Sequence, residues 1–288
     1  MDEFDFRVAD LYISLTEEQI PSDTPEAPQH WVQNDAGIPS RGRNPYYRWR
    51  IVVHGGIDGY SRMVVYLKAV ANNRAATVFQ SFFNAVQEYG QPSRVRSDKG
   101  RENTDVARFM VSVTGTDRNS HIAGKSVHNQ RIERLWRDVF ICVLETFYHM
   151  FYEMEARGVL HPENEVHLFA LHWVFLPQLQ NHLESFRRGW NHHRIRSAGN
   201  RSPLQMWIRG KSSGISSDPR QVDGEYGVDW SSEGQFENNN RGVLIPEINL
   251  RRPLSEEKLS TLSRPTCETL ESGLDLYVNT VDHLNNIL

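Results

Sequence analysis

The sequence predicts an α/β protein with a mixed sheet, and three observations support this fold class. Two segments rich in β-branched residues, Trp49–Ile57 and Met63–Val70, flank an Asp-Gly turn signal and predict a hairpin of two strands. The segment Arg74–Tyr89 has its apolar residues at helical spacing, and Gly90 ends it. Strand and helix signals then alternate along the chain. A hairpin followed by such alternation indicates a sheet that is covered by helices.

The remaining predicted elements complete this order. A short strand, a short helix and a second short strand precede two long helices; their expected ranges are Ser93–Ser97, Asp105–Val113, Asn119–Ile122, Val127–Arg157 and Glu163–Trp190. Pro177 lies inside the last helix and lacks a backbone donor, so we expect it to kink or divide that helix. A short apolar segment, Gly242–Leu250, predicts one more strand or a segment packed on the core.

The charge of the 288 residues is strongly segregated. Residues 1–40 contain nine acidic residues and one basic residue, whereas residues 41–210 contain 24 basic and 14 acidic residues. Residues 211–288 are acidic again, with 13 acidic and seven basic residues. A basic middle between acidic ends favours a polyanion such as nucleic acid as the partner of the middle segment.

Composition divides the chain into three parts. Residues 1–45 contain five prolines among polar residues and predict a weakly ordered acidic segment. Residues 46–210 hold the strand and helix signals and form the expected folded core. Residues 211–288 begin with Gly- and Ser-containing loops and predict an acidic C-terminal extension.

Several classes of protein are excluded by composition. Two cysteines, Cys142 and Cys267, can form neither a disulfide framework nor a four-cysteine zinc site. The longest apolar segment, near Val166–Leu176, is far shorter than the roughly 20 residues that a membrane span requires. The acidic start of the chain has no apolar stretch typical of a signal peptide. We therefore expect an intracellular protein with reduced cysteines and no membrane partner.

Three carboxylates are candidates for metal-dependent chemistry. Asp98 follows a predicted strand, Glu133 lies on the long predicted helix one turn after Asn129 and one turn before Arg137, and Asp58 lies in the hairpin turn. Carboxylates at strand and helix ends suit Mg²⁺ or Mn²⁺, and two such ions can promote cleavage or transfer of a phosphodiester. The alternative is structural, because an Asp before Gly often serves a turn and a helical Glu is often a solvated charge.

The segments around Asp98 and Glu133 resemble a known family. SDKGREN, followed after a loop by VHNQRIERLWRD, is similar to the second and third parts of the catalytic core of retroviral and retrotransposon integrases and related transposases. VVHGGIDGYSRMVVYLKAV resembles the hairpin of that core, and WNHHRIRSAGNRSPLQMW resembles its closing segment. The resemblance covers about residues 46–210 and is greatest to integrase core domains of uncharacterised eukaryotic proteins derived from mobile elements. It implies an RNase H-like fold.

The resemblance assigns roles to individual residues. Asp98 matches the second catalytic Asp and Glu133 the final Glu, so both would hold Mg²⁺ or Mn²⁺. Asn129 matches the helix Asn that helps order the site. Arg137 stands where these enzymes often place a basic residue that contacts DNA.

The first catalytic Asp of the family has no clear counterpart. It belongs on the first strand, before the hairpin, so Asp58 in the hairpin turn is not its match and is expected to accept hydrogen bonds from turn N–H groups. The resemblance places the first catalytic Asp about eight residues before Trp49, and Arg41 stands at that position. The nearest upstream carboxylate is Asp35. An Arg in place of a metal carboxylate removes a ligand and adds a repulsive charge, so we expect an impaired metal site.

Basic residues surround both matched carboxylates and predict contacts to nucleic-acid phosphates. The residues expected to bind nucleic acid are Lys99, Arg101, Lys125, Arg131, Arg134 and Arg137. Their alternative role is to solvate the surface of the helix. DNA is therefore the expected partner, in an intracellular and specifically nuclear location. Because cores of this family often dimerise, a homodimer is a further expectation.

Three function hypotheses follow. The favoured one is an integrase-derived nucleic-acid-binding protein with an impaired metal site. The second is an active Mg²⁺- or Mn²⁺-dependent polynucleotidyl transferase for DNA integration, in which Asp58 or Asp35 supplies a third ligand beside Asp98 and Glu133. The third is a protein-interaction scaffold, in which the acidic ends cover the basic core.

Overall fold

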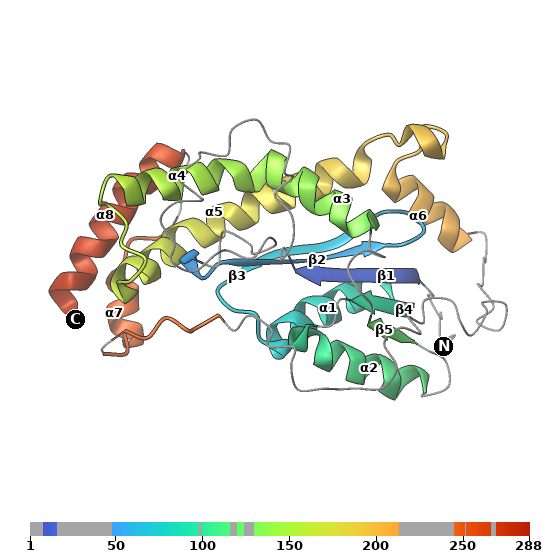
Figure 1. Ribbon diagram of the computed structural model, residues 1–288, viewed down its shortest axis with the longest axis horizontal. Helices are drawn as coiled ribbons and strands as arrows, with labels where there is room; N and C mark the ends of the chain where they lie inside the picture. Colours follow the sequence, from blue (N-terminus) through green and yellow to red (C-terminus); the bar gives the residue numbers. More distant parts are fainter. Residues whose placement is uncertain are drawn as a thin grey trace, which may run out of the picture.

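A five-stranded mixed sheet lies between two layers of helices (Figure 1). This computed structural model describes residues 8–15, 48–97, 100–115, 120–123, 130–212, 245–250, 252–265 and 269–288. The strands are β1 (Val8–Leu15), β2 (Val52–Asp58), β3 (Val64–Val70), β4 (Pro92–Ser97) and β5 (His121–Ala123). Their order across the sheet is β3-β2-β1-β4-β5. β1 runs antiparallel to β2 and parallel to β4, and β5 runs parallel to β4.

The central strand comes from the segment predicted to be weakly ordered. β1 pairs with β2 on one side and with β4 on the other, so it closes the gap between two halves of the sheet (Figure 1). The expectation that no ordered element precedes Tyr46 is therefore wrong for Val8–Leu15. The physical reason is that pairing on both sides satisfies the backbone of β1, which outweighs the polar, proline-rich composition around it. Arg41 and Asp35 lie outside the described residues.

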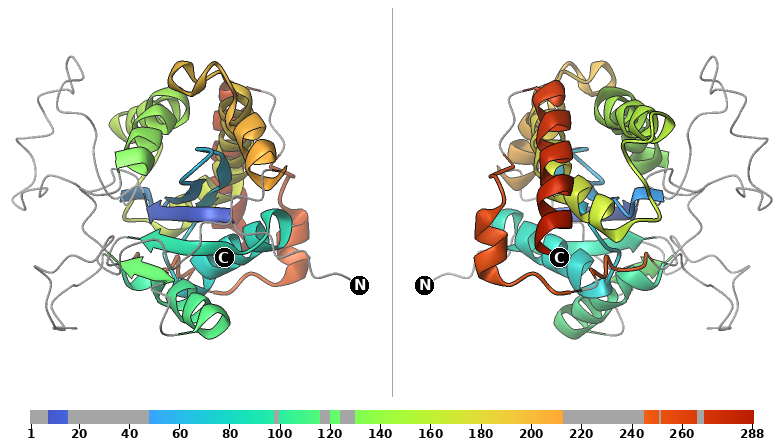
Figure 2. Two further views of the ribbon diagram at one scale, coloured as in Figure 1. Left: turned by 90° about the vertical axis from the view of Figure 1, so that its right-hand side faces the viewer. Right: turned by 90° about the vertical axis from the view of Figure 1, so that its left-hand side faces the viewer.

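Two helices cover one face of the sheet and four helical segments cover the other (Figures 1 and 2). α1 (Ala75–Tyr89) and α2 (Thr104–Thr114) pack below the sheet, with Phe82 and Met110 fully buried against Val95 of β4. Above the sheet lie α3 (Gln130–Val139), a π-helical segment (Phe140–Leu144), α4 (Glu145–Ala156) and α5 (Glu165–His192). The predicted hairpin, first helix and short strands are thus confirmed, with bounds that agree within three residues.

The two long predicted helices differ from expectation in one respect. α3, the π-helical segment and α4 form one run over residues 130–156, as the periodicity predicted. α5 continues through Pro177 for 28 residues, so the expected division there does not occur. Val174, Phe175, Gln178 and Leu179 around this proline are buried, and their packing compensates for the lost backbone hydrogen bond.

A short segment before β2 fastens the upper helices to the sheet. Trp49 is 1% exposed and its indole N–H donates to Glu155 of α4, which also accepts from Arg48 Nε at 2.8 and 2.9 Å. The Trp49 carbonyl is bonded to His172 Nε2 of α5 at 2.7 Å. Burial lowers the pKa of His172 to about 4, so its ring is neutral at pH 7.

The C-terminal extension contains more structure than its acidic composition predicted. α6 (Pro203–Ser212) ends the core, and α7 (Glu256–Thr261) and α8 (Leu270–Ile287) follow residues 213–244, which lie outside the described chain. α8 lies against α5 and buries Tyr277, Val281 and Leu284 in the same core (Figure 2). Residues 245–250 form no strand; instead Ile245 packs on Val52 and Val70, which was the alternative expectation.

Replacement of Leu11 by proline is expected to destabilise the whole domain. Leu11 lies in the middle of β1, opposite Asp58 of β2 and Val95 of β4, and proline removes its N–H while leaving a buried acceptor unpaired. We expect a loss of about 3 kcal/mol or more in the free energy of unfolding, measured by urea denaturation. Leu11→Val keeps the N–H and is the matched control. Equal stability of the two variants would show that β1 does not occupy the centre of the sheet.

Candidate functional site

The candidate metal site lies where the parallel strands β1 and β4 end. Ser97, the last residue of β4, pairs with Ile13 of β1 and with Ala123 of β5. It is completely buried, and its hydroxyl is bonded to His121 Nε2 at 3.2 Å. Asp98 follows Ser97 directly in the chain but lies outside the described residues. Ile13, Ser97 and Ala123 form one row across the sheet. A carboxylate on β1 must lie close to this row to share a metal ion with Asp98.

β1 places no carboxylate near that row. Its one acidic residue, Asp10, pairs with Arg94, which is three rows from the Ile13–Ser97 pair. At about 3.3 Å per residue, the Asp10 backbone is about 10 Å from the row in which β4 ends. The neighbouring position on β1 is Ser14, which pairs with Gly55 of β2. The strand register thus does not fit a three-carboxylate site for two divalent ions.

α3 carries the other matched carboxylate. The backbone of Glu133 is helical, as the sequence predicted, whereas Asn129 lies just before the described start of α3. Leu135 and Trp136 are buried against the sheet, so these two residues fix the helix orientation. Gly55 of β2 allows this close approach, because a Cβ there would come within 2.8 Å of the Trp136 ring.

The predicted basic residues are only partly described. Arg134 and Arg137 of α3 and Arg101 beside α2 are exposed. Arg137 Nε lies 3.7 Å from the carboxylate of Asp138, its neighbour on α3. Arg131 has a helical backbone in α3. Lys99 and Lys125 lie outside the described residues.

A buried glutamate in the motif after Asp98 was missed from the sequence. Glu102 is 4% exposed and accepts a hydrogen bond from Asn103 Nδ2 at 3.3 Å. A Cβ on Gly100 would collide with the Glu102 carboxylate, so this glycine makes room for the side chain. The Gly-x-Glu spacing in SDKGREN is the sequence signal from which this packing could have been predicted.

Asp58 has the structural role expected of a turn residue. It is 1% exposed and accepts hydrogen bonds from the Ser61 backbone N–H at 2.7 Å and from the Ser61 hydroxyl at 2.5 Å. Its own N–H donates to the Met63 carbonyl at 2.8 Å. These bonds fix the β2–β3 turn, in which Arg62 has a positive φ of 62°.

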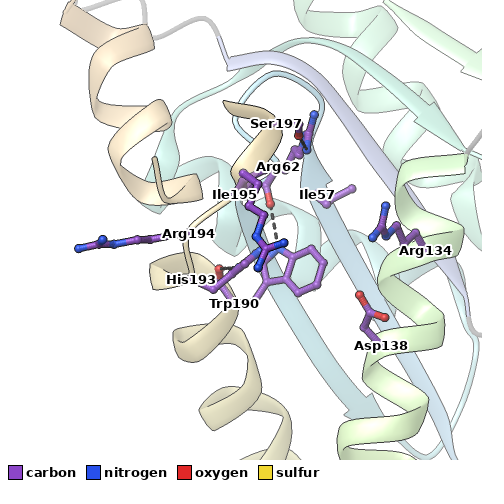
Figure 3. Close-up of a pocket in the computed structure, with 10 residues that line it drawn as sticks. Ile57, Arg62, Arg134, Asp138, Trp190, His193, Arg194, Ile195 and Ser197 are labelled. Carbon is purple, nitrogen blue, oxygen red and sulfur yellow. Dashed lines mark hydrogen bonds between the residues drawn. The ribbon is translucent and has the colours of Figure 1, made fainter. Parts of the chain in front are cut away.

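The Trp-Asn pair of the closing segment holds the start of β3. Asn191 is buried and clamps Val64, accepting from its N–H at 2.9 Å and donating to its carbonyl at 3.0 Å. Trp190 donates its indole N–H to the Arg62 carbonyl at 2.9 Å (Figure 3). Because β3 is the edge strand of the sheet, these side chains occupy backbone groups that would otherwise be unpaired.

The described residues contain neither a cluster of metal ligands nor a membrane-spanning helix. Among the residues that the structure describes, no group of three or more His, Cys, Asp or Glu side chains could hold a metal ion. Within the same part of the chain, every helix is too short or too polar to cross a membrane.

Comparison with known proteins identifies the family. Residues 41–220 match the family described as "Integrase core domain". One solved structure, the HTLV-2 integrase catalytic core domain in complex with magnesium, in a trimeric form, is similar at 13% identity and a TM-score of 0.36. That comparison covers 54% of this chain and 84% of the HTLV-2 chain. No curated protein sequence matches the chain.

The chain belongs to the integrase core domain family, because the match covers more than half of its length. Its mixed sheet with the order β3-β2-β1-β4-β5 and flanking helices is the RNase H-like fold of that family. The match begins at residue 41, so it does not include β1.

Replacement of Asn191 by aspartate is expected to destabilise the fold. The carboxylate still accepts from the Val64 N–H but places a buried negative charge against the Val64 carbonyl, where the amide now donates. We expect a loss of about 2–4 kcal/mol in the free energy of unfolding, measured by urea denaturation. The neighbouring exposed residue provides the control, since His192→Ala should change stability by less than about 0.5 kcal/mol. Similar losses in both variants would contradict a specific amide clamp.

Proposed function

We propose that this protein is a mobile-element-derived integrase core that binds DNA and whose two-metal site is impaired. Membership of the integrase core domain family supports the origin. The binding of DNA is supported by the excess of basic over acidic residues in residues 41–210 and by the exposed arginines on and near α3. Nuclear location and self-association remain predictions that accompany this proposal.

The register of β1 is the observation that supports the proposal of an impaired metal site. Asp98 and Glu133 would supply two carboxylates for Mg²⁺ or Mn²⁺, but the β1 position in the row of Ser97 is Ile13. An apolar residue offers no oxygen to a metal ion, and the next carboxylate on the strand is about 10 Å away. On the register of β1, the positions at which the carboxylate is missing are Ile13 and Ser14, whereas Arg41 lies outside the described residues.

In this proposal, the binding of DNA does not depend on the metal site. Phosphate contacts need exposed cations at suitable spacing and no metal ligand. Arg134 and Arg137 lie one turn apart on α3 and are both exposed. A protein of this kind would therefore bind duplex DNA through charge while lacking strand-transfer activity.

Binding of duplex DNA should weaken steeply as salt rises. We expect the logarithm of the association constant to fall linearly with the logarithm of salt concentration, with a slope of about −0.9 for each phosphate contacted. Fluorescence anisotropy of a labelled duplex with the full chain measures this slope. Arg101→Gln combined with Arg137→Gln should make it less steep by about two. A flat salt response of the unaltered chain would contradict the proposal.

Metal-dependent strand transfer tests the impaired site. With Mn²⁺ and a labelled duplex, we expect no nicking or transfer by the unaltered chain. Ser14→Asp adds a carboxylate in the row that follows the Ile13–Ser97 pair, and we expect activity to appear in this variant. Ser14→Asn has a similar shape without the charge and should remain inactive.

Two further variants test the active-transferase hypothesis. Activity in the unaltered chain that disappears with Asp98→Asn would show a working site with another third ligand, as in the active-transferase hypothesis. Loss of that activity with Asp35→Asn would identify Asp35 as this third ligand. Activity in the unaltered chain would contradict the impaired site while leaving the binding of DNA untouched.

A further inference from the structure

A cleft lies between α3, the end of β2 and the segment that follows α5. It has a volume of about 700 Å³ and extends from the β2–β3 turn to the segment that follows α5 (Figure 3). Four arginines line it, together with one acidic residue, Asp138. The basic residues are Arg62, Arg134, Arg194 and Arg196. Figure 3 shows the Arg194 side chain pointing away from the cleft, so the positive charge of the cleft comes from Arg62, Arg134 and Arg196.

The three arginines are held on three different elements. Arg62 lies in the β2–β3 turn, and its guanidinium donates to the Ser197 hydroxyl at 3.3 Å. Its backbone is fixed by the Trp190 indole, which donates to its carbonyl at 2.9 Å. Arg196 belongs to a short 3-10 turn after α5 and lines the cleft. Arg134 projects from α3, on the side of the cleft opposite Arg62 (Figure 3). Guanidinium groups from two sides of the cleft therefore line the same space.

The rest of the lining favours an anion. Ile57, Trp190 and Ile195 form apolar walls, which lower the local polarity and strengthen attraction between charges. The negative charge of Asp138 is offset by Arg137, whose Nε lies 3.7 Å from it. The cleft is thus an electropositive depression that offers guanidinium groups from two sides to one extended ligand.

We infer that this arginine cleft binds phosphates of the DNA backbone, as an extension of the interface on α3. The inference rests on the proposed function. Arg134 of the cleft and Arg137 lie one turn apart on the same helix, so a DNA strand that follows α3 reaches both. A phosphodiester strand carries a charge at every nucleotide, whereas an acidic peptide matches this density only in an unbroken run of Asp or Glu.

The test compares the salt dependence of DNA binding in two double variants of the full chain. Arg62→Gln with Arg196→Gln removes two cleft charges. Arg108→Gln with Arg157→Gln removes two exposed arginines that pair with acidic residues of their own helices, and serves as the control. Anisotropy of a labelled duplex between roughly 50 and 200 mM salt should give a slope less steep by about two in the cleft variant, and an unchanged slope in the control.

The Arg196→Gln single variant tests the cleft without altering the β2–β3 turn, which the replacement of Arg62 could misfold. Arg196 is exposed, and its replacement should reduce the slope by about one. A steep slope of the unaltered chain that both cleft variants retain would overturn the inference while leaving the proposed function standing. Absence of DNA binding by the unaltered chain would overturn both.

A competition arm distinguishes DNA from an acidic peptide. Poly-glutamate should displace the duplex less effectively than unlabelled DNA of equal charge, both for the unaltered chain and for the control. Tighter binding of poly-glutamate than of DNA that is lost in the cleft variant would assign the cleft to an acidic protein segment and would overturn the inference.

Discussion

The pairing of β1 with both β2 and β4 is the constraint on which the rest of the structure depends. β2 and β3 form one half of the sheet and β4 and β5 the other, and β1 is hydrogen-bonded to both halves. Helices α1 and α2 bury one face of this combined sheet, and α3 to α5 bury the other. Without the central strand, the core under α1 and α2 would lose the connection between β3 and β4, which contribute Val65 and Val95 to it. The register of the same strand also decides which residues stand beside Ser97.

The residues that stabilise the fold differ from those that a metal site would need, although both lie on the same elements. Trp49, Glu155 and His172 fasten the upper helices, and Asn191 and Trp190 secure the edge strand, yet none of these residues requires a metal ion. The scaffold of an integrase core can therefore persist while one metal ligand is lost. The basic residues can persist as well, because phosphate contacts depend on exposed charge and not on the geometry of a buried site.

Much of the local structure could be predicted from the residues themselves. The Asp-Gly turn, the helix that ends at Gly90 and the apolar stripe of the long helix through Leu135 and Trp136 are signals within a few residues, and each appears where it was expected. Glu133 is on a helix, as its motif indicated. The uninterrupted α5 and the helix α8 were not anticipated. Pro177 and the acidic extension carry adverse local signals, which burial against the core outweighs.

The sequence alone determined the family resemblance, the alternation of strands and helices, and the segregation of charge. Tertiary structure decided which segment became the central strand. VADLYISL contains alternating apolar residues, but its partners lie 39 or more residues away in the sequence, and no local pattern shows such pairing or its register. The arginine cleft has the same origin, because Arg62, Arg134 and Arg196 meet only when the turn, α3 and the end of α5 are packed around one sheet.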